Sequence, residues 1–173
     1  MASDTLYLII TGGAAATRIP ALLPSLISSY RRVITVPTPA AKQIVSLRDL
    51  ASIPGHHLVE GYFEPIIYPT PPGDALVAPC TFNSLNKLAQ GIADTLALSI
   101  VAEAIGRQHH VTVAISANAA LWAHPRAQES AATLRRWGCH VLDPVPDPGR
   151  GPDHLTMASD AAILAALAGP TRP

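Results

Sequence analysis

Short, continuously apolar runs alternate with longer stretches of helical periodicity along the chain. Residues 6–10 are apolar at every position, which is typical of a strand buried on both faces of a sheet. Similar runs rich in β-branched residues predict further strands at residues 33–36, 57–60, 75–78, 111–115 and 141–142. Strands that alternate with helices form parallel sheets covered by helices. The pattern therefore predicts the α/β class, with a central parallel sheet in the order 3-2-1-4-5.

Helical spacing of apolar residues fills most of the intervals between these runs. It predicts helices at residues 14–29, 38–51, 84–105, 125–137 and 156–168. Pro20 and Pro24 are expected to bend the first of these helices. Prolines crowd residues 54–72 and 143–155, where we expect a loop and a flexible flap or linker. Residues 1–173 are expected to form a single domain, because one core usually holds about 100–200 residues.

Composition narrows the possible environments and partners. Apolar residues make up 49% of the chain and charged residues 14%, so apolar faces beyond the core suggest self-association. Basic and acidic residues balance and the basic ones are scattered, which argues against a nucleic-acid partner. The start lacks signal-peptide features and no apolar run reaches about 20 residues, so we expect a cytoplasmic protein without membrane contact. Cys80 and Cys139 lack the spacing of a zinc site, and no metal is expected.

Small polar residues follow four of the predicted strands, at the edge where open parallel sheets bind their ligands. They are Thr11-Gly12-Gly13, Thr38, residues 81–84 and residues 116–118. Taken singly, each turn has a simpler explanation as a helix cap. Together they offer hydroxyl, amide and backbone N–H donors at helix starts, which favour an anion such as phosphate. GxGxxG and P-loop patterns are absent, so the residues favour a phosphorylated cofactor but disfavour a Rossmann dinucleotide site.

Four ordered segments carry a resemblance to a known family. Residues 79–96 resemble the stretch PAxxNTxxKxAxGxxDNLL, and residues 116–122, followed by His124-Pro125, resemble PxMNxxMW. Residues 12–16 stand where that family has TGSIAA, and residues 38–41 match its TPAA-type turn. The chain thus resembles, over roughly residues 5–143, the homo-oligomeric flavin-containing cysteine decarboxylase superfamily. Its members include phosphopantothenoylcysteine decarboxylase and the peptidyl-cysteine decarboxylases of lantibiotic biosynthesis.

The resemblance implies a Rossmann-like (flavodoxin-like) three-layer sandwich that binds FMN at an interface between subunits. It implies assembly as trimers, often four of them in a dodecamer. The residues that it places around FMN are Gly12, Gly13, Thr38, Pro79, Thr81, Asn83, Ser84, Ser116 and Ala117. Asn118 stands where the family holds the substrate carboxylate. In such enzymes the flavin oxidises a cysteine to a thioaldehyde, from which CO2 leaves to give an enethiolate.

The chain departs from the family pattern at several positions. The family's active-site histidine would fall near residues 64–66, where none is present, so His56 and His57 are the remaining candidate bases. Ser116 and Ala117 replace a proline and a methionine, which leaves more space beside the flavin. The flap at residues 143–155 lacks the cysteine that pantothenate-pathway enzymes use to reduce the enethiol, which disfavours phosphopantothenoylcysteine as substrate. Cys80 either touches the cofactor or fills a small buried position.

The leading hypothesis from the sequence is oxidative decarboxylation of a C-terminal peptidyl cysteine to an aminoenethiol, in the biosynthesis of ribosomal peptide natural products. The substrate would be a cysteine-containing peptide or a small thiol acid, and a biosynthetic enzyme is a possible partner. A second hypothesis is a flavoprotein scaffold or partner subunit without catalysis, because the histidine is missing. A third is other flavin chemistry on a small acid, as in the flavin prenyltransferases, whose Ser-rich phosphate-binding features are absent here.

Overall fold

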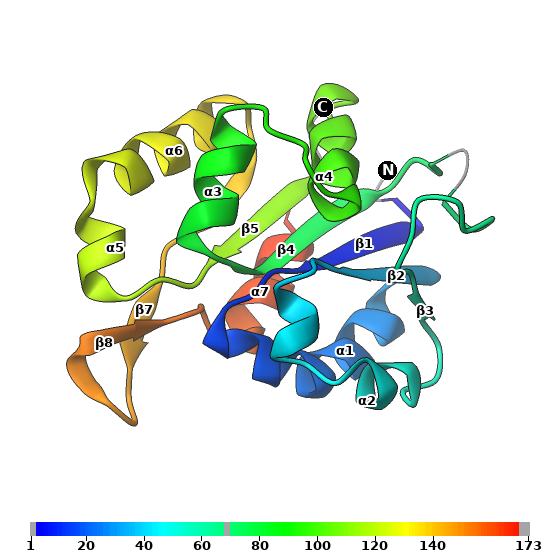
Figure 1. Cartoon of the computed structure of the whole chain (residues 1–173), viewed down its shortest axis with the longest axis horizontal. Coiled ribbons are helices and arrows are strands. Elements are labelled where there is room, and N and C mark those ends of the chain that lie inside the picture. The colour runs from blue at the N-terminus through cyan, green and yellow to red at the C-terminus, as the bar shows by residue number, and fades with distance from the viewer. Residues whose placement is uncertain (1–2, 68–69, 170–173) are drawn as a thin grey trace.

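A six-stranded parallel sheet forms the centre of the molecule in the computed structural model, which describes residues 3–67 and 70–169 (Figure 1). The strand order is β3-β2-β1-β4-β5-β6, which confirms the predicted order 3-2-1-4-5 and adds one strand at the edge. The strands are β1 (Thr5–Ile10), β2 (Arg32–Pro37), β3 (His57–Leu58), β4 (Asp74–Cys80), β5 (Val111–Ile115) and β6 (His140–Leu142). Each neighbouring pair is parallel, as the βα alternation requires.

Helices cover both faces of this sheet and make three layers. They are α1 (Ile19–Ser29), α2 (Leu47–Ala51), α3 (Phe82–Ala89), α4 (Leu96–Gly106), α5 (Ala119–Ala123), α6 (Pro125–Arg136) and α7 (Asp160–Leu167). Figure 1 shows α3, α4 and α6 on one side of the sheet, with α1 and α7 on the other. Two short 3₁₀ helices, Ala14–Arg18 and Ala41–Gln43, follow β1 and β2. The three-layer α/β architecture predicted from the sequence is confirmed.

Strand β1 shows why both faces need a helical layer. Its residues alternate between two separate hydrophobic clusters: Tyr7 and Ile9 join one, whereas Leu6, Leu8 and Ile10 join the other. All five are at most 1% exposed. Burying a Leu or Ile side chain of this kind stabilises the folded state by about 1.5–3 kcal/mol, so the strand is most stable where helices cover both of its faces. The continuous apolar run therefore lies at the centre of the sheet, where its carboxyl end contributes to the site.

The helix predicted at residues 84–105 is wrong as one element, because the structure divides it into α3 and α4. Gly91 has a φ of +71°, a left-handed conformation that ends the first helix. Thr95 then starts the second helix, since its hydroxyl accepts a hydrogen bond from Leu98 N at 3.3 Å. Apolar residues of both helices face the same layer of the core, so their spacing resembled one continuous helix.

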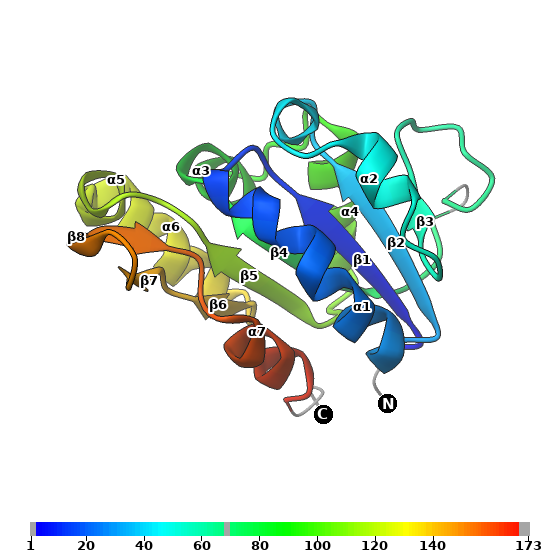
Figure 2. The same cartoon turned by 90° about the horizontal axis from the view of Figure 1, so that it is seen from below.

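Three other predicted elements have different boundaries. The helix expected at residues 38–51 is reduced to the 3₁₀ helix Ala41–Gln43 and the short α2, which Ser46 caps. Helix α7 begins at Asp160 rather than residue 156, since residues 151–156 form a strand. That strand, β8 (Gly151–Thr156), pairs antiparallel with β7 (Val145–Asp147), so most of the predicted flap is a β-hairpin (Figure 2). No helix among the described residues is long and apolar enough to cross a membrane.

Candidate cofactor and substrate cleft

Direct hydrogen bonds join the carboxyl ends of four neighbouring strands. Thr38 N, after β2, donates to Ile10 O at the end of β1, at 2.9 Å. The Thr11 hydroxyl donates to Pro79 O at 2.7 Å and accepts from Thr81 N at 3.1 Å, which joins β1 to β4. Ser116 N, after β5, donates to Cys80 O at 2.8 Å. The polar turns that the sequence placed after these strands are therefore held side by side.

These turns surround a cleft of about 900 Å³, a size typical of small-molecule sites. The cleft is lined by the predicted residues Gly12, Gly13, Thr38, Thr81, Asn83, Ser84, Ser116, Ala117 and Asn118. The structure thus brings together nearly all residues that the sequence proposed for FMN and substrate. Pro79 lies instead beneath this surface: it is buried, and its Cγ is 3.5 Å from where a Cβ on Gly13 would lie.

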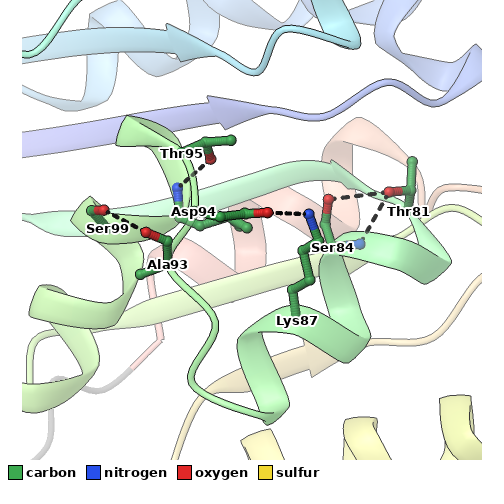
Figure 3. Close-up of polar contacts among 8 residues, drawn as sticks. Thr81, Ser84, Lys87, Ala93, Asp94, Thr95 and Ser99 are labelled. Atoms are coloured by element: carbon green, nitrogen blue, oxygen red, sulfur yellow. Dashed lines mark hydrogen bonds and ion pairs between the residues drawn. The ribbon is translucent and has the colours of Figure 1, made fainter.

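One end of the cleft is built for an anion. The N-terminus of α3 opens toward it, and the first amides of a helix lack acceptors within the helix. The Thr81 hydroxyl accepts from Ser84 N at 3.3 Å and donates to the Ser84 hydroxyl at 3.1 Å (Figure 3). Gly12 packs so closely on the next turn that a Cβ would lie 2.6 Å from Ala40 Cβ. These hydroxyl and backbone N–H groups suit a phosphate.

Apolar side chains and one amide also line the cleft. Phe82, Leu98 and Leu121 line it beside Ala117. Asn118 caps α5, since its Oδ1 accepts a hydrogen bond from Leu121 N at 2.8 Å. The carbonyl oxygen is thus engaged, so the amide nitrogen has two N–H donors to offer an acceptor in the cleft. These groups suit an aromatic ring system together with a carboxylate.

Lys87, Arg18 and Arg150, none of which the sequence analysis proposed, also line the cleft. Lys87 projects from α3, and its Nζ lies 2.6 Å from Asp94 Oδ2. Figure 3 shows this ion pair beside the start of α3. The hydrogen bond from Lys87 holds the pKa of the Asp94 carboxyl below its ordinary value. Arg18 bonds the Asp160 carboxylate and the carbonyl oxygens of Met157 and Ala158, far along the chain. Lys87 lies within the matched motif, which was a usable signal, whereas no sequence pattern connected Arg18 to the cleft.

The structure does not place the two candidate histidines at the cleft. His57 begins β3, opposite Ile34 of β2, and His56 precedes it. The His56 ring is engaged on both sides: Nε2 bonds Leu50 O at 2.9 Å and Nδ1 bonds the Thr35 hydroxyl at 2.8 Å. Neither histidine is among the described residues that line the cleft. Because β3 pairs with Ile34 and Thr35 of β2, which continues to Pro37, both histidines lie before the carboxyl end of the strands, where the site is.

Cys80 lies below the cleft rather than in it. Its side chain has no exposed surface and belongs to the hydrophobic cluster with Val77 and Leu85. Burial raises the pKa of the Cys80 thiol well above its ordinary value. Of the two interpretations drawn from the sequence, the buried filler agrees with this environment.

We therefore expect Cys80 to resist alkylation in the native protein. The thiolate is the reactive form, and burial both hinders access and disfavours ionisation. Iodoacetamide followed by peptide mass mapping should label Cys80 in urea but leave it unmodified in native protein at mildly alkaline pH. Because the pKa of Cys80 is higher in the folded than in the unfolded state, its contribution to the free energy of unfolding is constant below the unfolded pKa and decreases as the pH rises from there toward the folded pKa. Rapid native labelling would contradict the buried placement.

Comparison with known protein families matches residues 1–156 to the Flavoprotein family. The chain belongs to this family. Among curated relatives, the coenzyme A biosynthesis bifunctional protein CoaBC of Mycobacterium tuberculosis (strain ATCC 25618 / H37Rv) is 28% identical over 168 residues, covering 91% of this chain. The chain spans 40% of the length of that relative.

Solved structures of other flavoproteins share the fold of this member. A PPC decarboxylase variant complexed with pantothenoylaminoethenethiol has a TM-score of 0.80 at 18% identity, covering 96% of this chain and 97% of its own. The FMN-dependent cysteine decarboxylase TvaF from thioviridamide biosynthesis has a TM-score of 0.71 at 24% identity, covering 95% and 98%. The fold that the resemblance implied is thereby confirmed, and the name of TvaF shows that one protein with this fold depends on FMN.

The residues of the cleft fit this cofactor. A phosphate would meet Thr81, Ser84 and the α3 N-terminus, and an apolar ring would meet Phe82 and Leu98. Gly12 packs closely on Ala40 and Gly13 on Thr81, so a larger residue at either position would clash with the neighbouring turn. Among the described part of the chain, no group of three or more His, Cys, Asp or Glu residues could hold a metal ion.

Proposed function

We propose that this flavoprotein binds FMN in the cleft and oxidatively decarboxylates a C-terminal cysteine or a related thiol acid. One observation carries the proposal: the turns after β1, β2, β4 and β5 converge on a single cleft that also contains Asn118. Bound FMN would supply the two-electron oxidant, accepting a hydride from the cysteine Cβ while the thiol gives up its proton. The protein would supply binding, orientation and proton transfer.

In this proposal Asn118 orients the substrate. Its free amide N–H groups donate to the substrate carboxylate, while its carbonyl oxygen stays fixed by Leu121 N. Phe82, Leu98 and Leu121 keep water away from the reacting carbons. Apolar surroundings disfavour the charged carboxylate relative to neutral CO2, so they favour decarboxylation. Thr38, Thr81 and Ser84 hold the phosphate.

Two substrate classes remain for the proposed reaction. Similar structures include a peptidyl-cysteine decarboxylase and a PPC decarboxylase variant complexed with pantothenoylaminoethenethiol, and these names suggest a peptidyl cysteine or a pantothenoyl-linked cysteine. The hairpin over residues 145–156 contains no cysteine, which favours a product that leaves as the enethiol. We therefore propose a peptide ending in cysteine as the substrate, and a product destined for further natural-product maturation.

A direct assay tests the proposal. Purified protein should be yellow, release FMN on denaturation, and convert a peptide ending in cysteine to a product lighter by CO2 and two hydrogens. Phosphopantothenoylcysteine should be converted poorly, and the same peptide ending in serine should not react. Retained FMN without conversion of either thiol acid would favour the scaffold hypothesis, whereas protein that stays colourless in excess FMN would contradict the cofactor assignment.

We further propose that the protein works as a homo-oligomer, in trimers or dodecamers. Ile92 and Trp137 are partly exposed and lie at one apolar groove, together with Leu88 and Ile105. Exposed large apolar side chains of this kind often mark contacts between subunits. Light scattering after size-exclusion chromatography should give a mass of at least three chains.

A further inference from the structure

The β7–β8 hairpin brings ionisable side chains to the cleft that the proposed function has not used. Asp147, Arg150 and His154 line the cleft on this side. Strand β8 contacts α5, the helix that Asn118 caps, and both figures of the fold show the hairpin beside that helix (Figures 1 and 2). The hairpin therefore adjoins the end of the cleft where the Asn118 amide would hold a carboxylate.

The other ionisable groups that line the cleft already have partners. Lys87 pairs with Asp94, and Arg18 pairs with Asp160. Asp147 Oδ1 accepts a hydrogen bond from Gly149 N at 2.9 Å. Among the described ionisable residues of the cleft, only Arg150 and His154 have side chains without a bonding partner.

His154 differs from Arg150 in the chemistry that it can perform. An arginine keeps its charge at every physiological pH, so it can attract an anion but cannot take up a proton. Histidine is the side chain whose ordinary pKa lies near neutrality, which suits proton transfer. Among the described residues of the cleft, His154 is the only histidine.

We propose that His154 accepts the proton of the substrate thiol while Asn118 holds the carboxylate. This inference rests on the proposed function. In the step, the S–H bond breaks, the proton moves to a ring nitrogen of His154, and the electron pair stays on sulfur. A neutral imidazole and a thiol thereby become an imidazolium and a thiolate, with no net change of charge. The sulfur anion can then support removal of hydrogen from the neighbouring carbon.

Neighbouring charges act on both products of this transfer. Arg150 stabilises the thiolate but opposes the imidazolium, whereas Asp147 stabilises the imidazolium. Arg18 and Lys87 line the same cleft, but the carboxylates of Asp160 and Asp94 largely offset their charges. Helix α5 contributes no ionisable side chain, since its sequence is Ala-Ala-Leu-Trp-Ala. The proton transfer therefore depends chiefly on the hairpin itself.

His154→Gln in the FMN-loaded protein tests the inference. Loss of a general base typically lowers rates by about 10²–10⁴-fold, so kcat/KM for a peptide ending in cysteine should fall within this range at neutral pH. The loss should shrink as the pH approaches the pKa of the free thiol, and added imidazole should restore part of the rate with His154→Ala. FMN content should stay at the wild-type level. His140→Gln is the matched control, because His140 is exposed on the edge strand β6 and does not line the cleft.

A second measurement does not depend on turnover. A peptide ending in cysteine amide has the thiol but no carboxylate to lose, and ultraviolet difference spectra report whether its bound thiol is ionised. Thiolate in the wild-type complex at neutral pH and its loss in His154→Gln would support the role, even if no peptide were decarboxylated and the proposed function failed. Unchanged spectra and an unchanged pH profile in an active variant would overturn it while leaving the proposed function intact. A wild-type protein with neither turnover nor bound thiolate would overturn both.

Discussion

Asn118→Asp should abolish most decarboxylation without removing the cofactor. The aspartate keeps an oxygen that can accept from Leu121 N, so the cap of α5 is retained. It loses the two N–H donors and places a negative charge where the substrate carboxylate would bind. Loss of a hydrogen bond to a charged group costs about 1.5–3 kcal/mol, and repulsion adds to it, so kcat/KM should fall about 100- to 1,000-fold.

The measurement combines steady-state kinetics with FMN content and thermal unfolding. Asn86→Asp is the matched control, because Asn86 Oδ1 accepts from the Ser130 hydroxyl at 2.8 Å and the residue does not line the cleft. It should retain wild-type kinetics. An Asn118→Asp protein with normal kcat/KM would show that the amide does not hold the carboxylate, whereas loss of FMN with loss of activity would indicate a structural role.

Gly12→Ala should weaken FMN binding strongly, although it adds a single methyl group. Its Cβ would lie 2.6 Å from Ala40 Cβ and 2.9 Å from the Ala40 carbonyl carbon. The backbone after β1 or β2 must then move, and overpacking of this kind typically costs about 1–3 kcal/mol. Since both turns line the cleft, the dissociation constant of FMN should rise about 10- to 100-fold.

Fluorescence titration of the apoprotein with FMN measures this effect. Gly106→Ala is the control, since a Cβ there has no neighbour within 4 Å and the residue lies in α4. That variant should bind FMN normally and be as stable as the wild type or slightly more so. Equal FMN affinity in Gly12→Ala and Gly106→Ala would contradict the close packing of the two turns as a requirement of the site.

The sheet was predictable because its strands differ from their surroundings in a simple way. The apolar run at residues 6–10 requires burial on both faces, and only a central strand provides it. The break between α3 and α4 was harder to predict, because Leu88 and Leu98 pack into the same cluster on either side of it. Residues 90–95 separate the two helices, and the one clear signal of a break there, Gly91, is a residue type that is also tolerated within a helix.

The residues of the site were likewise predictable where local interactions determine them and unpredictable where contacts distant in the sequence do. Thr81 and Asn118 were found because capping residues at strand ends have a local chemical reason to be there. The flap was expected, but its side chains Arg150 and His154 were missed, because nothing local in a proline-rich segment indicates which residues face a cleft formed by turns far earlier in the chain. His56 shows the opposite error: a residue type suitable for catalysis was assigned without knowing that Thr35 and Leu50 engage its ring.

The contacts of Arg18 couple the turn after β1 to the base of the β7–β8 hairpin. This side chain belongs to the turn after β1, yet it binds the backbone of Met157 and Ala158, directly after the hairpin. A cofactor that orders the turn after β1 therefore also favours the observed arrangement at the base of the hairpin. By reciprocity, a substrate bound by the hairpin raises the affinity of the turn for the cofactor. Cofactor and substrate would then bind cooperatively in part through a single guanidinium, in addition to their direct contact in the cleft.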